Sequence, residues 1–165
     1  MSYMEDKIPE IVGEFYEELP KFPDGRINYS KADKAATTVV FLIHEDEILL
    51  LKRSEEVKHR QNKWGVVAGF LDELKPLIEK SFEEVEEETG VEKDMISSIE
   101  IGETYRFNQE ETTFISHPMM MDLETKPEIE ISWEHTEYKW VKINEAKEYL
   151  PGYAKKELKM LLSKD

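Results

Sequence analysis

The sequence predicts a mixed α/β (α+β) fold, in which helices cover both faces of a central mixed sheet. Residues 36–43 form a β-branched, apolar run, which is typical of a buried strand. Residues 76–89 carry apolar side chains at a spacing of three and four, which predicts an amphipathic helix. Strand and helix patterns alternate without a regular strand–helix–strand rhythm, so we expect a mixed sheet rather than a purely parallel one.

The individual elements follow from apolar runs and from the turn signals between them. The predicted strands cover residues 36–43, 48–53, 64–69, 99–108, 112–123 and 138–141. The central helix begins near Pro76, a residue favoured in the first helical turn, and ends at Gly90. A last amphipathic helix covers residues 153–162.

Residues 1–35 are predicted to form an N-terminal helical arm and loop, and residues 36–165 the main domain. Apolar residues at helical spacing predict a short helix at residues 8–19, and Asp24-Gly25 marks a turn. The apolar face of this helix needs a cover, from the main domain or from a second subunit. A homodimer formed through the arm is therefore one prediction of the sequence.

The composition limits the classes of function. With 39% hydrophobic and 36% charged residues among 165, we expect one folded, soluble domain. The net charge of −15 argues against a broad nucleic-acid surface and against binding to an anionic membrane. No apolar run approaches membrane-spanning length. The absence of cysteine excludes disulfides and thiolate metal sites and fits a cytoplasmic location, which we expect.

Five glutamates lie within residues 83–88, inside the predicted central helix. Glu84, Glu87 and Glu88 are spaced at i, i+3 and i+4, so their side chains share one face. Like charges at this spacing repel by about 0.2–0.5 kcal/mol per pair. Such a face is either solvated or holds a cation, and clustered carboxylates suit hard divalent ions such as Mg²⁺. The glutamates alone leave both interpretations open.

Residues 69–91 resemble the Nudix box, which reads Gly, five residues, Glu, seven residues, Arg-Glu-hydrophobe-any-Glu-Glu-any-Gly-hydrophobe. The positions that match are Gly69, Glu84, Val85, Glu87, Glu88, Gly90 and Val91. Lys75 stands where the motif has its first Glu, and Glu83 stands where it has Arg. The flanking residues 49–54, 64–69 and 134–141 also resemble the family, so that the resemblance covers residues 36–162.

The resemblance implies a Nudix-type α/β/α sandwich and a hydrolase that depends on Mg²⁺ or Mn²⁺. It implies cleavage of a phosphoanhydride bond in a nucleoside diphosphate linked to another moiety, a small nucleotide-type substrate. By the same resemblance, Glu84, Glu87 and Glu88 bind the metal, joined by the backbone carbonyl of Ala68. The base that activates water stays open between Glu84, Glu88 and Glu134, which lies in a loop before a late strand.

The two departures from the box reverse the expected charges together. We hypothesise that Lys75 and Glu83 form an ion pair with exchanged signs, which orients the neighbouring metal-binding Glu84. The alternative is that both positions drifted independently and impaired the site. In that case the chain is a Nudix-fold protein that binds a nucleotide or metabolite without turnover, as a sensor or subunit.

Two arginines are candidates for contacts with substrate phosphates. Arg53 ends the second predicted strand, and Arg106 lies within a later one. The guanidinium group suits bidentate contacts with phosphate. For each arginine, the alternative interpretation is an ordinary surface charge on an exposed strand face.

Overall fold

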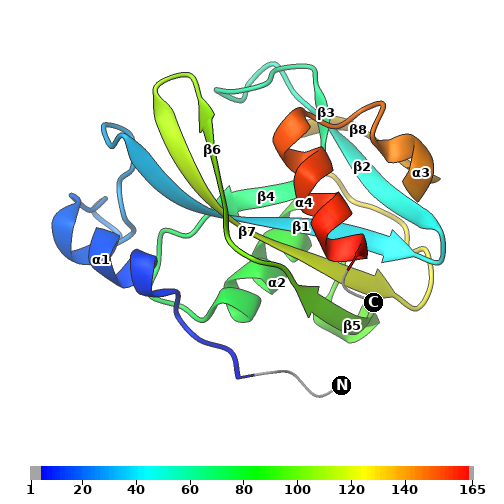
Figure 1. The fold of residues 1–165 in the computed structure, drawn as a ribbon, viewed down its shortest axis with the longest axis horizontal. Helices are drawn as coiled ribbons and strands as arrows, with labels where there is room; N and C mark the ends of the chain where they lie inside the picture. The colour runs from blue at the N-terminus through cyan, green and yellow to red at the C-terminus, as the bar shows by residue number, and fades with distance from the viewer. Residues whose placement is uncertain (1–4, 164–165) are drawn as a thin grey trace.

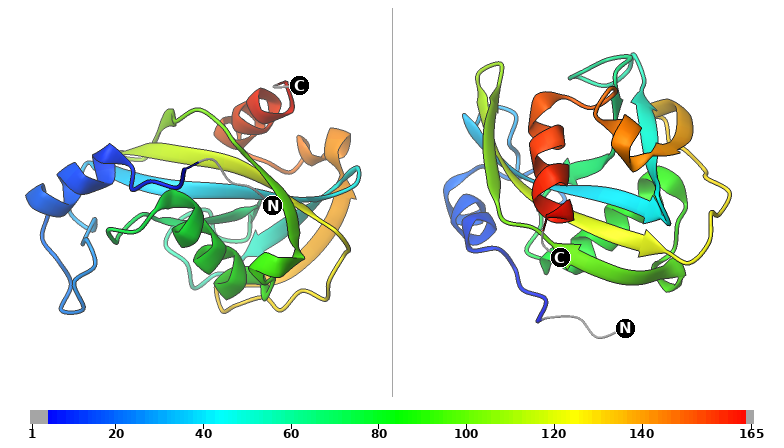
Figure 2. Two further views of the ribbon diagram at one scale, coloured as in Figure 1. Left: turned by 90° about the horizontal axis from the view of Figure 1, so that it is seen from below. Right: turned by 45° about the vertical axis from the view of Figure 1, so that its right-hand side comes forward.

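The computed structural model describes residues 5–163, and in this part of the chain eight strands form one mixed sheet (Figure 1). Helix α2 (Leu77–Thr89) covers one face, and α4 (Gly152–Leu162) covers the other, together with the short α3 (Ile143–Ala146). Figure 2 shows this arrangement edge-on, with α2 and α4 on opposite sides of the sheet. The predicted fold class is therefore confirmed.

Two long parallel strands, β1 (Lys34–His44) and β7 (Thr112–Leu123), form the centre of the sheet. Each has two antiparallel partners, one at either end. The start of β1 pairs with β4 and its end with β2, whereas the start of β7 pairs with β6 and its end with β5. These strands are β2 (Glu47–Arg53), β4 (Val67–Phe70), β5 (Ile96–Ile101) and β6 (Tyr105–Gln109). Strand β2 also pairs with β3 (Trp64–Gly65) and β8 (His135–Lys142).

Two predicted strands are each divided in the structure. Residues 64–69 form β3 and β4, which pair with different neighbours, β2 and β1. Residues 99–108 are divided between β5 and β6 because the chain leaves β5 near Gly102, whose N–H bonds to the Pro118 carbonyl. This division lets β5 and β6 pair with different halves of β7.

Helix α2 begins next to Pro76 and ends at Gly90, as predicted, but its N-terminal cap was not predicted. Gly90 adopts a left-handed φ of 77°, which glycine tolerates best, and closes the helix. Pro76 precedes the first turn and offers no side-chain cap. Instead, Asp6 accepts hydrogen bonds from the N–H groups of Ile78 at 2.7 Å and Glu79 at 3.0 Å. The N-terminal arm therefore caps the acidic helix.

The arm also contributes to the core through helix α1 (Glu10–Glu18). Its buried residues Val12 and Phe15 pack with Ala36 of β1 and Ile115 of β7. The turn at Asp24-Gly25 closes a small hairpin, in which Phe22 N–H bonds to the Arg26 carbonyl. Within residues 5–163, no helix has the length and apolar character needed to cross a membrane.

Candidate active site

The acidic helix α2 packs against strand β4 at Gly69. A Cβ atom at this position would lie 2.4 Å from the carboxyl carbon of Glu84 and 2.4 Å from its Oε2. Real Cβ atoms essentially never come this close to another atom, so glycine is what lets the Glu84 carboxylate lie on the β4 backbone. Gly69, the first residue of the box, is thus in direct contact with Glu84 in its later, helical part.

Glu88 is the most deeply buried of the predicted metal ligands, with only 2% of its surface exposed. It accepts a hydrogen bond from the backbone of Ala68, and burial, with Glu134 and Glu84 nearby, raises its pKa well above the ordinary value. Ala68, whose carbonyl is one of the predicted metal ligands, therefore lies beside Glu88. The Oε2 atom of Glu88 has no hydrogen-bond partner.

Glu84 is partly buried beside Glu88, whereas Glu87 is exposed. Burial raises the pKa of Glu84 to about 7; Glu87 adds to the rise, and Lys80 opposes it. Ionising both Glu84 and Glu88 in this setting is unfavourable unless a cation accompanies them. The acidic face is therefore not simply solvated.

Glu134 is brought to the same place from the loop before β8. It lines a cleft together with Arg53 and Ala68. The backbone N–H of Ser54 donates to the Glu134 carbonyl at 2.8 Å, which fixes the loop to the end of β2. Burial raises the pKa of Glu134, while Arg53 opposes the shift and Glu87 adds to it.

The two arginines lie in different places. Arg53 lines the cleft, and its Nε donates to the His59 carbonyl at 2.8 Å. Arg106 lies on β6, where neighbouring side chains alternate between the two faces of the sheet. Phe107 faces the cleft, and Arg106 lines a separate hollow beside Asp6. The structure does not bring Arg106 to the carboxylates.

Lys75 and Glu83 are joined in the structure. The Nζ atom of Lys75 lies 3.0 Å from Oε1 and 2.9 Å from Oε2 of Glu83. Lys75 Nζ also lies 3.5 Å from Glu73 Oε2. The hydrogen bond with Glu83 is the largest cause of the raised pKa of Lys75. The orienting role of this pair stays a prediction.

One charged residue beside the site, Lys80, was not predicted from the sequence. Its Nζ lies 3.8 Å from Glu84 Oε1, and its side chain is 8% exposed. The i, i+4 spacing between Lys80 and Glu84 is visible in the sequence and could have indicated this contact. Its contact with Asp72 at 3.2 Å depends on the path of the loop before α2, which the spacing does not reveal.

The cleft beside the carboxylates has a volume of about 190 Å³, and its apolar walls combine aromatic and aliphatic side chains. Phe107 and Tyr153 stack with ring centroids 3.8 Å apart, which joins β6 to α4 at its rim. Phe70 and Phe114 stack at 6.5 Å. The polar residues that line the cleft are Thr37, Arg53, His59, Arg60, Gln109 and Glu134. A flat apolar ring with a charged substituent would suit these walls.

The donors near α2 fit a hard divalent cation. Among residues 5–163, no three acidic, histidine or cysteine side chains have already converged as a metal site. Glu84 and Glu88, however, are oxygen donors with raised pKa values, and Glu88 Oε2 has no partner. A bound cation would compensate the charge of both carboxylates and engage the unpartnered oxygen.

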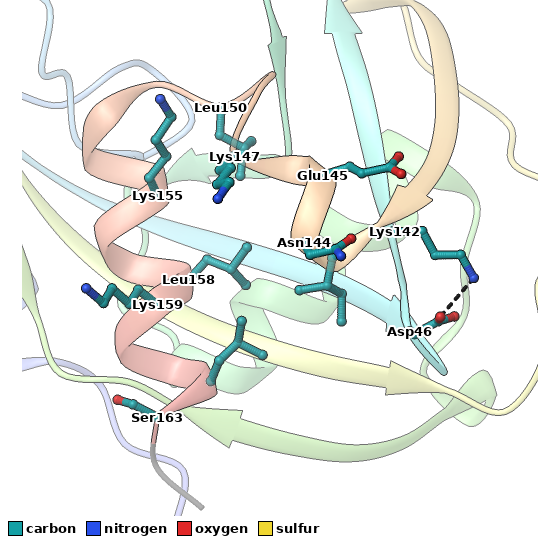
Figure 3. Close-up of a pocket in the computed structure, with 12 residues that line it drawn as sticks. Asp46, Lys142, Asn144, Glu145, Lys147, Leu150, Lys155, Leu158, Lys159 and Ser163 are labelled. Carbon is teal, nitrogen blue, oxygen red and sulfur yellow. Dashed lines mark hydrogen bonds and ion pairs between the residues drawn. The ribbon is translucent and has the colours of Figure 1, made fainter.

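A second, larger hollow of about 950 Å³ lies between α3 and α4, away from the box (Figure 3). Lys147, Lys155 and Lys159 surround an apolar floor that includes Leu150 and Leu158. None of the box glutamates lines it. Its size alone does not make it the site, because catalytic carboxylates and phosphate-binding groups are needed together.

The fold and site define a class of protein, an α/β/α sandwich with a glutamate-bearing helix beside a cleft. The particular family follows from the sequence. Residues 33–162 match the NUDIX domain, which is most of the chain, and the protein belongs to the Nudix family. The suspected resemblance is therefore confirmed.

Several solved structures share this fold. The MutT protein of Methanosarcina mazei Go1 is 26% identical with a TM-score of 0.66, covering 78% of this chain and 93% of that chain. A C. elegans Ap4A hydrolase in a binary complex is 19% identical with a TM-score of 0.63, covering 80% and 96%. The E. coli dihydroneopterin triphosphate pyrophosphohydrolase is 17% identical with a TM-score of 0.65, covering 77% and 94%. No curated protein matches the chain.

Proposed function

We propose that this protein is a divalent-metal-dependent hydrolase that cleaves a phosphoanhydride bond in a nucleoside diphosphate linked to another moiety. One observation carries the proposal: the partly buried Glu84 packs on Gly69 and the buried Glu88 lies beside it, and Gly69 lines a cleft that also contains Arg53. Membership of the Nudix family, and similarity to structures named as hydrolases, support it.

Glu84, Glu87, Glu88 and the Ala68 carbonyl would hold Mg²⁺ or Mn²⁺. When bound, such an ion neutralises phosphate charge and makes a coordinated water more acidic. A proton acceptor is then needed close by. Burial raises the pKa of Glu84, Glu88 and Glu134, and that of Glu84 reaches about 7, which suits a general base that works near neutral pH.

The cleft supports a nucleotide-type substrate. Arg53, beside Glu134, would contact phosphate oxygens. The aromatic walls formed by Phe70, Phe107 and Phe114 would pack against a planar base. Phosphates and base would then lie at opposite ends of one cleft, with the reacting bond beside the carboxylates.

The test is hydrolysis of a panel of nucleoside diphosphate derivatives, followed by ³¹P NMR, with Mg²⁺, with Mn²⁺ and with chelator. We expect metal-dependent release of phosphorylated products, and a rate at least 100-fold lower for Glu88→Gln, because removal of one catalytic group typically costs about 10²–10⁴-fold. The exposed Glu148→Gln serves as the matched control. Metal-independent turnover, or an active Glu88→Gln enzyme, would contradict the proposal.

The second candidate is a Nudix-fold protein that binds a nucleotide or metabolite without hydrolysing it. The reversed charges at Lys75 and Glu83 favour this alternative, since Glu83 adds negative charge beside Glu84. Saturable binding of a panel member by calorimetry, with no product in either metal, would select it.

A further inference from the structure

Lys80 is a buried lysine in the first turn of the acidic helix α2. Its relative exposure is 6%, and its Nζ lies 2.6 Å from Glu73 Oε1, 3.2 Å from Asp72 Oδ1 and 3.8 Å from Glu84 Oε1. A lysine in such a place must be paired, because an uncompensated buried ammonium is costly. The three carboxylates around it meet this need.

Lys80 connects the exchanged pair to the metal-binding face. Lys75 bonds to Glu83 on one side and approaches Glu73 at 3.5 Å on the other. Lys80 shares the same Glu73 and reaches Glu84. Ion pairs thus connect five side chains in the order Glu83, Lys75, Glu73, Lys80 and Glu84, with acidic and basic groups alternating.

The orientation of Glu84 follows from its two neighbours. Its Oε1 is directed to Lys80 at 3.8 Å. Its Oε2 is the carboxylate oxygen nearer to Gly69, lying 2.4 Å from where a Cβ would be. One oxygen therefore lies within ion-pair distance of the lysine, and the other lies against Gly69 of β4.

We propose that Lys80 is a positioning residue, which fixes the Glu84 carboxylate over Gly69 and supplies the cation that Glu83 fails to provide. This inference rests on the proposed function, because it takes Glu84 as a metal ligand. Lys80 does not line the cleft, so it acts through Glu84 and not on the substrate. The cation lost at position 83 is replaced three residues earlier on the same helix.

A competing role is a counter-ion that only neutralises charge and opposes metal binding. The two roles predict opposite changes in metal affinity when Lys80 is replaced. If Lys80 only competes with the metal, removing its charge tightens metal binding. If it positions Glu84, removing it weakens metal binding, because Glu84 must then be ordered at the moment of binding.

The test measures Mn²⁺ affinity by electron paramagnetic resonance for the wild type, Lys80→Met and Lys80→Arg. We expect Lys80→Met to bind Mn²⁺ at least tenfold more weakly and Lys80→Arg to recover most of the affinity. The kcat of Lys80→Met should fall while KM for the nucleotide changes less than threefold, since the cleft is intact. Lys156→Met, an exposed lysine on α4, is the matched control and should bind Mn²⁺ as the wild type does.

The outcomes separate this inference from the proposed function. A wild-type chain that binds no Mn²⁺ overturns both. A wild type that binds Mn²⁺, with equal or tighter binding by Lys80→Met, overturns the positioning role alone. If Lys80→Met does not fold, Lys80→Gln replaces it, because its amide can still donate to Asp72 and Glu73 without a charge, and the same tenfold loss is expected.

Discussion

At the scale of single residues, Gly69 and Glu84 depend on each other. The carboxylate of Glu84 occupies the space that a side chain at position 69 would need. The box spacing indicated both residues, because a motif fixes residue types at sequence positions. It did not indicate that Lys80 also lies 3.2 Å from Asp72, since that contact depends on how the loop before α2 folds.

Gly69→Ala should weaken metal binding while leaving the fold intact. The added methyl group meets the far end of a flexible side chain, so Glu84 can move away at little cost. We expect Mn²⁺ affinity to fall at least tenfold, about 1.4 kcal/mol, and the free energy of unfolding to change by less than about 1 kcal/mol. Titration with Mn²⁺ followed by electron paramagnetic resonance measures the affinity, and thermal unfolding measures the stability.

The control for this substitution is Gly13→Ala in α1, where an added Cβ meets nothing within 4 Å. It should stabilise the protein by about 0.5–1 kcal/mol, because alanine suits a helix interior better than glycine. Its Mn²⁺ affinity should be that of the wild type. Equal Mn²⁺ affinity in Gly69→Ala would show that Glu84 does not bind the metal from this position.

At the scale of elements, local signals predicted most of the structure and long-range contacts account for what was missed. The helix end at Gly90 and the strand at residues 36–43 were predicted, because each is encoded in neighbouring residues. The division of residues 99–108 was missed, since it depends on pairing with both halves of β7. The cap of α2 was missed because Asp6 lies 72 residues from Ile78.

Asp6→Ala should loosen the first turn of α2. The carboxylate of Asp6 accepts two N–H groups there, and loss of a helix cap typically costs about 1 kcal/mol. We expect that loss in the free energy of unfolding and faster amide hydrogen exchange at Ile78 and Glu79. Glu5→Ala is the matched control, since Glu5 is exposed and its pair with Lys7 is long, at 3.7 Å. An unchanged exchange rate at Ile78 would mean that the arm does not cap the helix in solution.

At the scale of the whole molecule, one sheet joins the α1–α2 side to the α3–α4 side, and each side has its own apolar core. The glutamates lie on α2, and the cleft beside them, which Gly69 and Glu134 line, is also lined by Pro151 and Tyr153 around the start of α4. The site is therefore assembled from both sides of the sheet. The shape of the cleft therefore depends on how firmly α4 packs against the sheet. The boundary between the arm and the main domain at residues 35 and 36 stays a prediction, and so does a dimer formed through the arm.

Glu157 of α4 makes the stability of the whole molecule depend on pH. It is fully buried, its Oε2 accepts a hydrogen bond from Ser116 at 2.5 Å, and its Oε1 has no partner. Burial raises the pKa of Glu157 to about 7 from 4.5, and the bond from Ser116 opposes the shift. Between these two values the folded protein binds more protons than the unfolded chain, so its stability falls as pH rises.

Glu157→Gln removes this ionisation and keeps an acceptor for Ser116. Its free energy of unfolding should equal that of the wild type near pH 4, and the advantage of the variant should grow up to pH 7. At pH 8 the variant should be more stable by up to about 3 kcal/mol. Urea unfolding across this range measures the difference, with the exposed Glu148→Gln as control. A constant difference between variant and wild type from pH 4 to 8 would mean that Glu157 does not ionise in this window.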